Sequence, residues 1–411
     1  MSETVVVGAG LSGMVAAINL AREGREVLVR ERRREVGGET DIRGLEGKVI
    51  NIGDGTPMNL ERIREYTGID ISPVAVPLRE ARNHVYGKSY TIKFYEGVPN
   101  YLVERGPRPT SLDVYLYNLA VKEGVRFQFN DTVTDFEELP PDSIIATGLF
   151  GEAWPRLEIP HMPVYGYLAM AEVEDTAPRV ILYFDEYTRD YAFYSQVNGA
   201  CGAVLFSRGK PLDVSVKERF ERQLAMNDAI EFDQWEAVNI GCLPVDSPRN
   251  PRLFSRNFIL AGTLSGTMDP LLLFGVHGAL VSGKIAATAV SDHQAALEEF
   301  NRINLYYRFA YYVSMVYRKM PLFLLKNLVW LGVRTYPYSA AFKNPCNTWP
   351  RPFAPRSRWR VRALEGRSGK HQPLPGAAGG AGGAGAPGGS ARTRRPPAGY
   401  MRCRFPRRTL P

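Results

Sequence analysis

The sequence predicts an α/β fold in which a parallel sheet covered by helices is interrupted by an antiparallel sheet and followed by more helices. Three observations predict this class. Residues 4–31 follow the order strand, glycine-rich turn, helix and strand, residues 164–207 alternate between aromatic and polar side chains, and an apolar strand and helix return within 258–290. With 411 residues, 45% of them apolar, the chain can bury the cores of two domains.

The N-terminal unit is predicted from the spacing of its apolar residues. Residues 5–7 form an apolar run short enough for a buried parallel strand, and residues 11–23 have apolar side chains at helical spacing. Gly24 follows at a position where helices commonly end, and residues 27–29 supply the second strand.

The remaining elements describe a domain that is discontinuous in sequence. The alternation within 164–207 is typical of an antiparallel sheet with one lined face. The apolar strand and helix that follow it return to the first sheet, so the antiparallel sheet is inserted into the parallel domain. The other expected elements are helices at 59–66, 112–123 and 275–290 and strands at 125–129, 143–146 and 258–260.

The net charge of +8 is concentrated at the C-terminal end of the chain. Residues 351–411 contain 14 Lys and Arg residues against one acid, Glu365, which leaves 37 basic and 42 acidic residues in 1–350. The body is therefore mildly acidic, and we expect no specific nucleic-acid partner. From residue 355 onward the sequence is rich in Pro, Gly, Ala and Arg, which predicts a disordered basic tail.

The cysteines, the N-terminal start of the fold and residues 304–335 indicate where in the cell the protein is expected. The four cysteines are far apart and form no CxxC motif, so we expect no metal site and no disulfide framework. The first strand begins at Thr4, and we expect no signal peptide and a reducing, cytoplasmic location. Residues 304–335 are rich in aromatic and aliphatic side chains, but basic residues interrupt them too often for a membrane span. Peripheral membrane contact and packing of this helical segment on the sheet domain both remain open.

A glycine motif connects the first strand to the first helix. Gly8, Gly10 and Gly13 form a GxGxxG pattern, in which the glycines permit a tight turn, close approach of a pyrophosphate and close packing of the helix. Residues 380–385 match the pattern too, but no strand precedes them and no helix follows them. Glu31 stands 18 positions beyond Gly13 at the end of the second strand, where a carboxylate accepts hydrogen bonds from an adenosine ribose and repels a 2′-phosphate. The sequence therefore predicts a Rossmann-type unit that binds FAD or NAD.

Three further patterns resemble FAD-binding proteins. Gly37 and Gly38 follow Glu31 after five residues, which resembles the glutathione-reductase-type flavoproteins, and residues 143–148 resemble the strand-then-ATG signature of such proteins. Residues 262–283 resemble, with matching spacing, the second FAD segment of the geranylgeranyl reductase-like flavoproteins, relatives of the aromatic-hydroxylase flavoenzymes.

The resemblance covers roughly residues 4–300 and implies a Rossmann-type FAD-binding domain with an inserted antiparallel-sheet substrate domain, a helical C-terminus and a disordered tail. It implies that the helix start near Gly275 faces the isoalloxazine ring and stabilises negative charge on the reduced flavin. Arg105 matches the flavin-contacting arginine of the family. Two departures stand out: Thr263 replaces an aspartate that contacts the ribityl chain, and the family's Gly-Tyr-x-Trp-x-Phe-Pro stretch is reduced here to residues 191–195.

The expected segments and site residues follow from these patterns. We expect the FAD-binding domain in two parts, the sheet domain, the C-terminal helices and the tail at 1–160 and 251–300, 161–250, 301–350 and 355–411 respectively. The expected FAD-binding residues are Gly8, Gly10, Leu11, Ser12, Gly13, Glu31, Arg32, Gly38, Arg105, Val133, Gly148, Thr263, Asp269, Gly275 and Val276.

The resemblance implies an oxidoreductase that saturates C=C bonds of a prenyl or other lipid-like substrate with hydride from reduced FAD, which places it in lipid metabolism. Such a reaction needs a proton donor, for which Tyr191 is the first candidate. His277 at the start of the flavin helix either lies near the ring or caps or packs against that helix, and Cys201 is expected to be a buried, inert thiol. A flavin monooxygenase on a hydrophobic or aromatic substrate and a non-catalytic FAD-binding paralogue remain open. The electron donor is NADPH, a ferredoxin-like protein or a quinone, among which the sequence does not choose.

Overall fold

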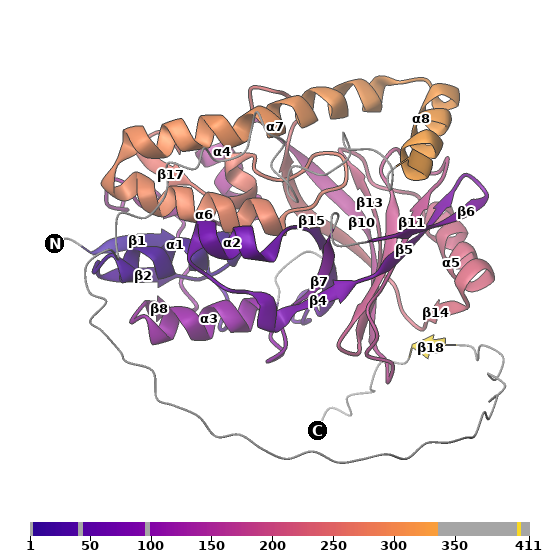
Figure 1. The fold of residues 1–411 in the computed structure, drawn as a ribbon, viewed down its shortest axis with the longest axis horizontal. Coiled ribbons are helices and arrows are strands. Elements are labelled where there is room, and N and C mark those ends of the chain that lie inside the picture. Colours follow the sequence, from indigo (N-terminus) through magenta and orange to yellow (C-terminus); the bar gives the residue numbers. More distant parts are fainter. Residues whose placement is uncertain (1–2, 40–43, 95–98, 336–400, 404–411) are drawn as a thin grey trace, which may run out of the picture.

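The structure, a computed structural model, describes residues 3–39, 44–94, 99–335 and 401–403. Figure 1 shows two sheet-based parts beside each other, with the long helix α7 (His293–Lys319) running along one side of the molecule. The predicted disordered tail lies outside the described residues, apart from the short strand β18 (Met401–Cys403), which pairs with β14 (Ile230–Phe232).

The first part is a six-stranded sheet in the order β16-β17-β9-β1-β2-β8. Its pairs are parallel except for the edge pair β16–β17. The apolar strand β1 is buried along its whole length because helices cover both faces of the sheet, as is usual for parallel strands. The strand predicted at 258–260 joins this sheet beside β9, as the discontinuous arrangement requires. The strands are β1 (Thr4–Val7), β2 (Val27–Arg30), β8 (Arg126–Gln128), β9 (Ile144–Ile145), β16 (Phe254–Ser255) and β17 (Phe258–Leu260).

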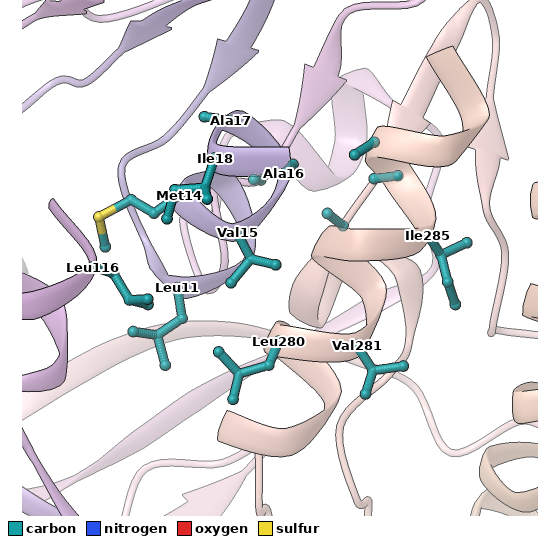
Figure 2. Packing of buried hydrophobic residues seen from close by; sticks show 14 of the residues in the cluster. Leu11, Met14, Val15, Ala16, Ala17, Ile18, Leu116, Leu280, Val281 and Ile285 are labelled. Carbon is teal, nitrogen blue, oxygen red and sulfur yellow. The ribbon is translucent and has the colours of Figure 1, made fainter. Parts of the chain in front are cut away.

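Two helices from distant parts of the sequence pack on each other over this sheet. Figure 2 shows α1 (Leu11–Arg22) beside α6 (Val276–Ser291), with Val15 of α1 near Leu280 and Val281 of α6. A Cβ atom at Gly283 would lie 2.5 Å from the carbonyl oxygen of Ser12, so the two helices can approach this closely only where a side chain is absent. Leu116 of α3 (Leu112–Lys122) packs on the other side of α1.

The second part is a seven-stranded sheet in the order β15-β10-β13-β12-β11-β5-β6. It includes β5 and β6, from residues 80–93, which the sequence placed in the first domain. The reason is that β5 pairs in parallel with β11, whose residues lie about a hundred positions later. The local sequence around β5 cannot reveal a pairing over that separation. The strands are β5 (Glu80–Val85), β6 (Lys88–Lys93), β10 (His161–Glu172), β11 (Arg179–Phe184), β12 (Ala192–Val197), β13 (Ala200–Arg208) and β15 (Glu236–Pro244).

The alternation predicted from the aromatic residues separates the two faces of this sheet. Tyr183 and Tyr194 pack under α5 (Val214–Asp228), whereas Phe184 and Tyr191 belong to the opposite face. That opposite face also contacts α8 (Leu322–Thr335) through Trp330. Buried aromatic residues therefore fill one face and line the other.

Smaller elements connect the two sheets. A three-stranded sheet is formed by β3 (Ile52–Pro57), β7 (Asn100–Arg105) and β4 (Ala75–Leu78). The short helices are α2 (Leu60–Thr67), α4 (Ala153–Arg156) and the 3-10 turns at Ser72–Val74 and Gly262–Ser265. Among the helices that the structure describes, none combines the length and the apolar character that a bilayer span requires.

Candidate functional site

A cavity of about 810 Å³ extends from the glycine turn of the first sheet to the second sheet. This volume falls within the range of roughly 300–1,000 Å³ that is usual for small-molecule and cofactor sites. Four regions line the cavity: the turn after β1 with the ends of neighbouring strands, the Asp54–Arg105 region of β3 and β7, the aromatic face of the second sheet, and the segment from Gly262 to Ala279.

The turn after β1 takes its shape from glycines. At Gly8 the backbone has φ +103°, and an added Cβ would lie 2.7 Å from the carbonyl oxygen of Ala146. An added Cβ at Gly13 would lie 2.0 Å from the carbonyl oxygen of Gly8. In the part of the chain that the structure describes, no side chain caps α1 at Gly10, so its first N–H groups and its positive dipole end are left for a bound anion.

Glu31 is fixed beside this turn by the backbone. Its Oε2 accepts a hydrogen bond from the N–H of Ala9 at 2.7 Å, and its Oε1 accepts one from the N–H of Arg33 at 3.0 Å. Arg32 lies with its guanidinium 4.1 Å from the centre of the Phe150 ring. The carboxylate therefore stands at the position from which the second strand of a Rossmann unit contacts an adenosine ribose.

Arg105 is held by two carboxylates at the wall of the cavity. Its Nε and Nη2 donate to Asp113 at 2.7 and 3.0 Å, and its Nη1 donates to Asp54 at 3.1 Å. Burial disfavours the Arg105 cation, but the two carboxylates hold its pKa above the ordinary value. Burial also raises the pKa of Asp54, against the opposing effect of Arg105. Sequence reasoning missed Asp54, because its partner is 51 positions away and no motif joins them.

The segment after β17 supplies the opposite wall. Gly275 is the N-cap of α6, and Gly275, Val276 and Thr263 all line the cavity. Asp269 does not line it: the Asp269 carboxylate accepts hydrogen bonds from the N–H groups of Leu271 and Leu272 at 2.9 and 2.8 Å and from the hydroxyl of Tyr306. Asp269 therefore holds the loop whose residues 272–274 face the cavity.

Most residues predicted from the sequence come together at this cavity. Gly13 and Gly38 do not line it. Gly13 packs against the backbone of Gly8 behind the turn, and Gly37 lines the cavity where Gly38 was predicted to do so. The predicted residues that do line the cavity are Gly8, Gly10, Leu11, Ser12, Glu31, Arg32, Arg105, Val133, Gly148, Tyr191, Thr263, Gly275 and Val276. Their roles toward a cofactor stay predictions.

Tyr191 is the predicted proton donor. It is buried on the aromatic face, and its hydroxyl donates to the carbonyl oxygen of Leu272. Burial, with the nearby charges of Asp269 and Asp54, raises the pKa of Tyr191 well above its ordinary value. His277 and Cys201 are both buried, and neither lines the cavity. Both side chains are therefore part of the packed interior.

The end of the cavity at the second sheet is apolar. The buried hydroxyl of Ser195 interrupts it, and the buried hydroxyl of Thr147 lies on the cavity wall at the first sheet; neither has a hydrogen-bond partner among the described residues. Buried polar atoms of this kind normally have a partner, so a bound molecule with polar groups fits both positions. The apolar lining residues are Val164, Val180, Leu182, Phe193, Phe206, Leu243, Met268, Leu272, Leu273 and Phe274.

Comparisons with known proteins agree with this arrangement. A family model described as an NAD(P)-binding Rossmann-like domain matches residues 6–56. Kynurenine 3-monooxygenase of Salinispora arenicola is 30% identical over 158 residues, and that of Christiangramia forsetii is 30% identical over 141 residues. The match spans 32% and 29% of the length of these two relatives and about a third of this chain.

Solved structures share the fold over most of the chain. A geranylgeranyl bacteriochlorophyll reductase-like protein from Thermoplasma acidophilum is 15% identical, with a TM-score of 0.58 over 84% of this chain and 98% of its own. For 2-methyl-3-hydroxypyridine-5-carboxylic acid oxygenase the identity is 16% and the TM-score 0.57, over 84% and 96% of the two chains. CtdE, solved in complex with FAD, is 14% identical with a TM-score of 0.53, over 82% and 98%.

The protein therefore has a Rossmann-like domain at its N-terminal end and shares its overall fold with a reductase-like protein, an oxygenase and a protein solved in complex with FAD. This confirms the fold class and the resemblance that the sequence indicated. Within that class, the fold is shared with a reductase-like protein and with an oxygenase alike.

Proposed function

We propose that the protein is an FAD-dependent oxidoreductase that reduces C=C bonds of a prenyl or other lipid-like substrate. One observation carries this proposal: a single cavity joins the glycine turn to an apolar wall of aromatic and aliphatic side chains. A cofactor at the turn and an apolar substrate at the sheet would share one cavity, in which the substrate would lie against the apolar wall.

The residues of the cavity fit FAD from end to end. The N–H groups at the start of α1 would bind the pyrophosphate, and Glu31 would bind the adenosine ribose. At the other end, Arg105 and the start of α6 would lie toward the flavin ring, where a positive dipole end stabilises added negative charge. Thr263 lines the cavity and offers a hydroxyl where the related proteins have an aspartate.

In alkene reduction, the residues of this chain would donate a proton to the substrate and hold the substrate in a fixed orientation. FAD, when bound and reduced, would supply the hydride. Tyr191 lies on the cavity wall and carries the phenol that would donate the proton. Burial raises the pKa of Tyr191 and so weakens it as an acid, which means that the substrate would have to take up the proton together with the hydride. Ser195, on the same wall, has a free hydroxyl that would bind a polar group of the substrate.

A second candidate is a flavin monooxygenase acting on a hydrophobic or aromatic substrate. The observation that favours it is the 30% identity to two kynurenine 3-monooxygenases over 158 and 141 residues. The same cavity would accept an aromatic ring against Phe193 and Phe206. In both candidates the electrons would come from NADPH, a ferredoxin-like protein or a quinone.

The first test is an absorption spectrum of the purified full-length chain, followed by anaerobic reduction. We expect bound FAD near one equivalent, and reduced enzyme that is reoxidised slowly by air and rapidly by a prenyl diphosphate or another polyprenyl chain. Rapid oxygen consumption with a hydroxylated product would support the monooxygenase instead. Bound FAD with no turnover by either route would identify a non-catalytic protein, and absence of FAD would overturn the proposal.

The role of Tyr191 is tested separately with Tyr191→Phe. We expect turnover to fall by about 100-fold, the usual contribution of a general acid, while the FAD content is unchanged. Tyr187→Phe is the matched control, because that partly buried phenol packs on the cluster at the other face of the sheet and donates to Gln223.

A further inference from the structure

The helices α7 and α8 expose an unusual number of large apolar side chains. Leu305, Phe309, Tyr312 and Val316 follow one another at spacings of four, three and four residues, so they form one stripe along α7. The exposed fractions of Phe309 and Tyr312 are 63% and 53%. Helix α8 exposes Phe323, Leu324, Leu328 and Leu331, of which Phe323 is 65% exposed. We call these eight residues the apolar face.

The opposite sides of both helices are occupied by the body of the protein. Tyr307 and Tyr311 of α7 pack into the core around α1 and α6. Val329, Trp330 and Val333 of α8 pack on the cluster that contains the cavity residues Leu182 and Phe193. The exposed side chains are thus the outer side of two helices whose inner sides are already buried, and among the described residues no element covers them.

The charged residues within the stretch that carries the apolar face have one sign, although Lys326 and Arg302 pair with Glu186 and Glu299 outside that stretch. Residues 301–335 contain six Lys and Arg residues and no Asp or Glu. Arg308, Lys319 and Arg334 are exposed beside the apolar side chains. Arg318 does not belong to this set, because it pairs with Asp190 and Asp246 in the interior.

We propose that the apolar face and its basic residues dock the protein on an anionic membrane surface. Large apolar side chains on one side of a helix, bordered by Lys and Arg, insert at the boundary of headgroups and acyl chains while the cations contact lipid phosphates. The positive charge argues against the chain's own tail as the occupant, because residues 351–411 carry 14 basic residues and one acid and would be repelled. A second copy presents the same positive charge to itself.

The placement of α8 connects this surface to the cavity. One side of α8 belongs to the apolar face, and its other side packs on the hydrophobic cluster against which the cavity residues Leu182 and Phe193 also pack. Docking itself goes beyond the proposed function and does not depend on it, since it is measured without turnover.

The test is flotation of the full-length chain with vesicles of phosphatidylcholine alone and with 30% phosphatidylglycerol. We expect strong binding to the anionic vesicles only. The double variant Phe309→Ser with Phe323→Ser is expected to bind about tenfold more weakly, because it removes two inserted rings. Arg308→Gln with Lys319→Gln is expected to bind about 25-fold more weakly, from about fivefold for each cation.

Matched controls separate the face from the tail and from general surface effects. Met226→Ser on α5 and Val121→Ser with Lys122→Gln on α3 remove equally exposed side chains elsewhere, and Figure 1 shows α3 on the side of the molecule away from α7. We expect these variants to bind like the wild type. Because every variant keeps the tail, unchanged binding by the face variants would show that the tail alone attracts the vesicles, and the proposal would be wrong.

A direct probe of insertion is Phe323→Trp with brominated lipid in the vesicles. We expect the added tryptophan fluorescence, relative to the wild type, to shift to the blue and to be quenched, and Met226→Trp to show neither. A blue-shifted signal without vesicles, or a dimer in sedimentation velocity that Phe309→Ser dissociates, would show that protein covers the face and would overturn membrane docking.

Discussion

Asp54 of β3 and Arg105 of β7 form an ion pair across neighbouring strands, with 3.1 Å between Oδ2 and Nη1. Arg105 also makes a two-pronged contact with Asp113, at 2.7 and 3.0 Å. One guanidinium thus fixes the cavity wall to the start of α3. Because bidentate pairs have a defined geometry, the direction of the Arg105 cation toward the cavity is set before any ligand arrives.

Arg105→Met is expected to weaken FAD binding by about tenfold or more and to lower the free energy of unfolding by about 2 kcal/mol, because Asp113 is left without its partner. Isothermal titration and urea unfolding measure the two effects. Arg108→Met is the control. Arg108 lies three residues after Arg105, pairs with Glu104 and does not line the cavity. Equal FAD affinity in both variants would remove Arg105 from the cofactor site.

Gly13→Ala is expected to destabilise the protein by about 3 kcal/mol and to abolish FAD binding, because its Cβ would lie 2.0 Å from the Gly8 carbonyl oxygen and displace the turn. Gly332→Ala is the matched change within a helix, and no atom lies within 4 Å of its added Cβ. It is expected to stabilise the protein by roughly 0.5–1 kcal/mol. Thermal unfolding of the two variants measures the difference, and similar melting temperatures would contradict the close approach.

Glu31→Gln is expected to weaken FAD binding by about tenfold to 100-fold, because a neutral amide accepts less strongly from the N–H groups of Ala9 and Arg33 and from the ribose. Glu35→Gln, an exposed change four residues later, should leave the affinity unchanged. The measurement is fluorescence titration of the apoprotein with FAD. Stronger binding of NADPH than of FAD by the wild type would contradict this assignment of Glu31.

His277 predicts a pH dependence of stability. Burial lowers its pKa to about 4, from 6.5. Below pH 6.5 the unfolded chain takes up a proton that the folded protein excludes, so stability is complete above pH 6.5 and falls as the pH drops toward 4. The loss attributable to this residue is up to about 3 kcal/mol.

The variant His277→Gln should flatten that part of the profile. Urea unfolding at pH 7 and pH 4.5 measures it, with His293→Gln as the control, because His293 is exposed. An equal loss of stability between the two pH values in wild type and His277→Gln would show that other groups carry the effect.

The parts of the fold that the sequence predicted are those encoded by local spacing. The turn at Gly8, the helices α1 and α6 and the two-faced aromatic strands follow from patterns of a few residues. The pairing of β5 with β11 and the Asp54–Arg105 contact did not, because both depend on register between distant strands. Asp269 shows a third case: its position in the motif was recognised, but its carboxylate serves the loop rather than the cavity.

The contact between α1 and α6 has a consequence for the order of events during synthesis. Gly262 and Gly283 pack directly on Ser12. The dinucleotide turn is therefore supported by residues about 250–270 positions later in the sequence. A ribosome adding about 5–20 residues per second completes α6 roughly 10 to 50 seconds after the GxGxxG motif emerges. A nascent chain of the first hundred residues therefore carries the whole fingerprint without the site. A cofactor that needs the complete turn could therefore bind only after α6 has been translated, long after the first strand.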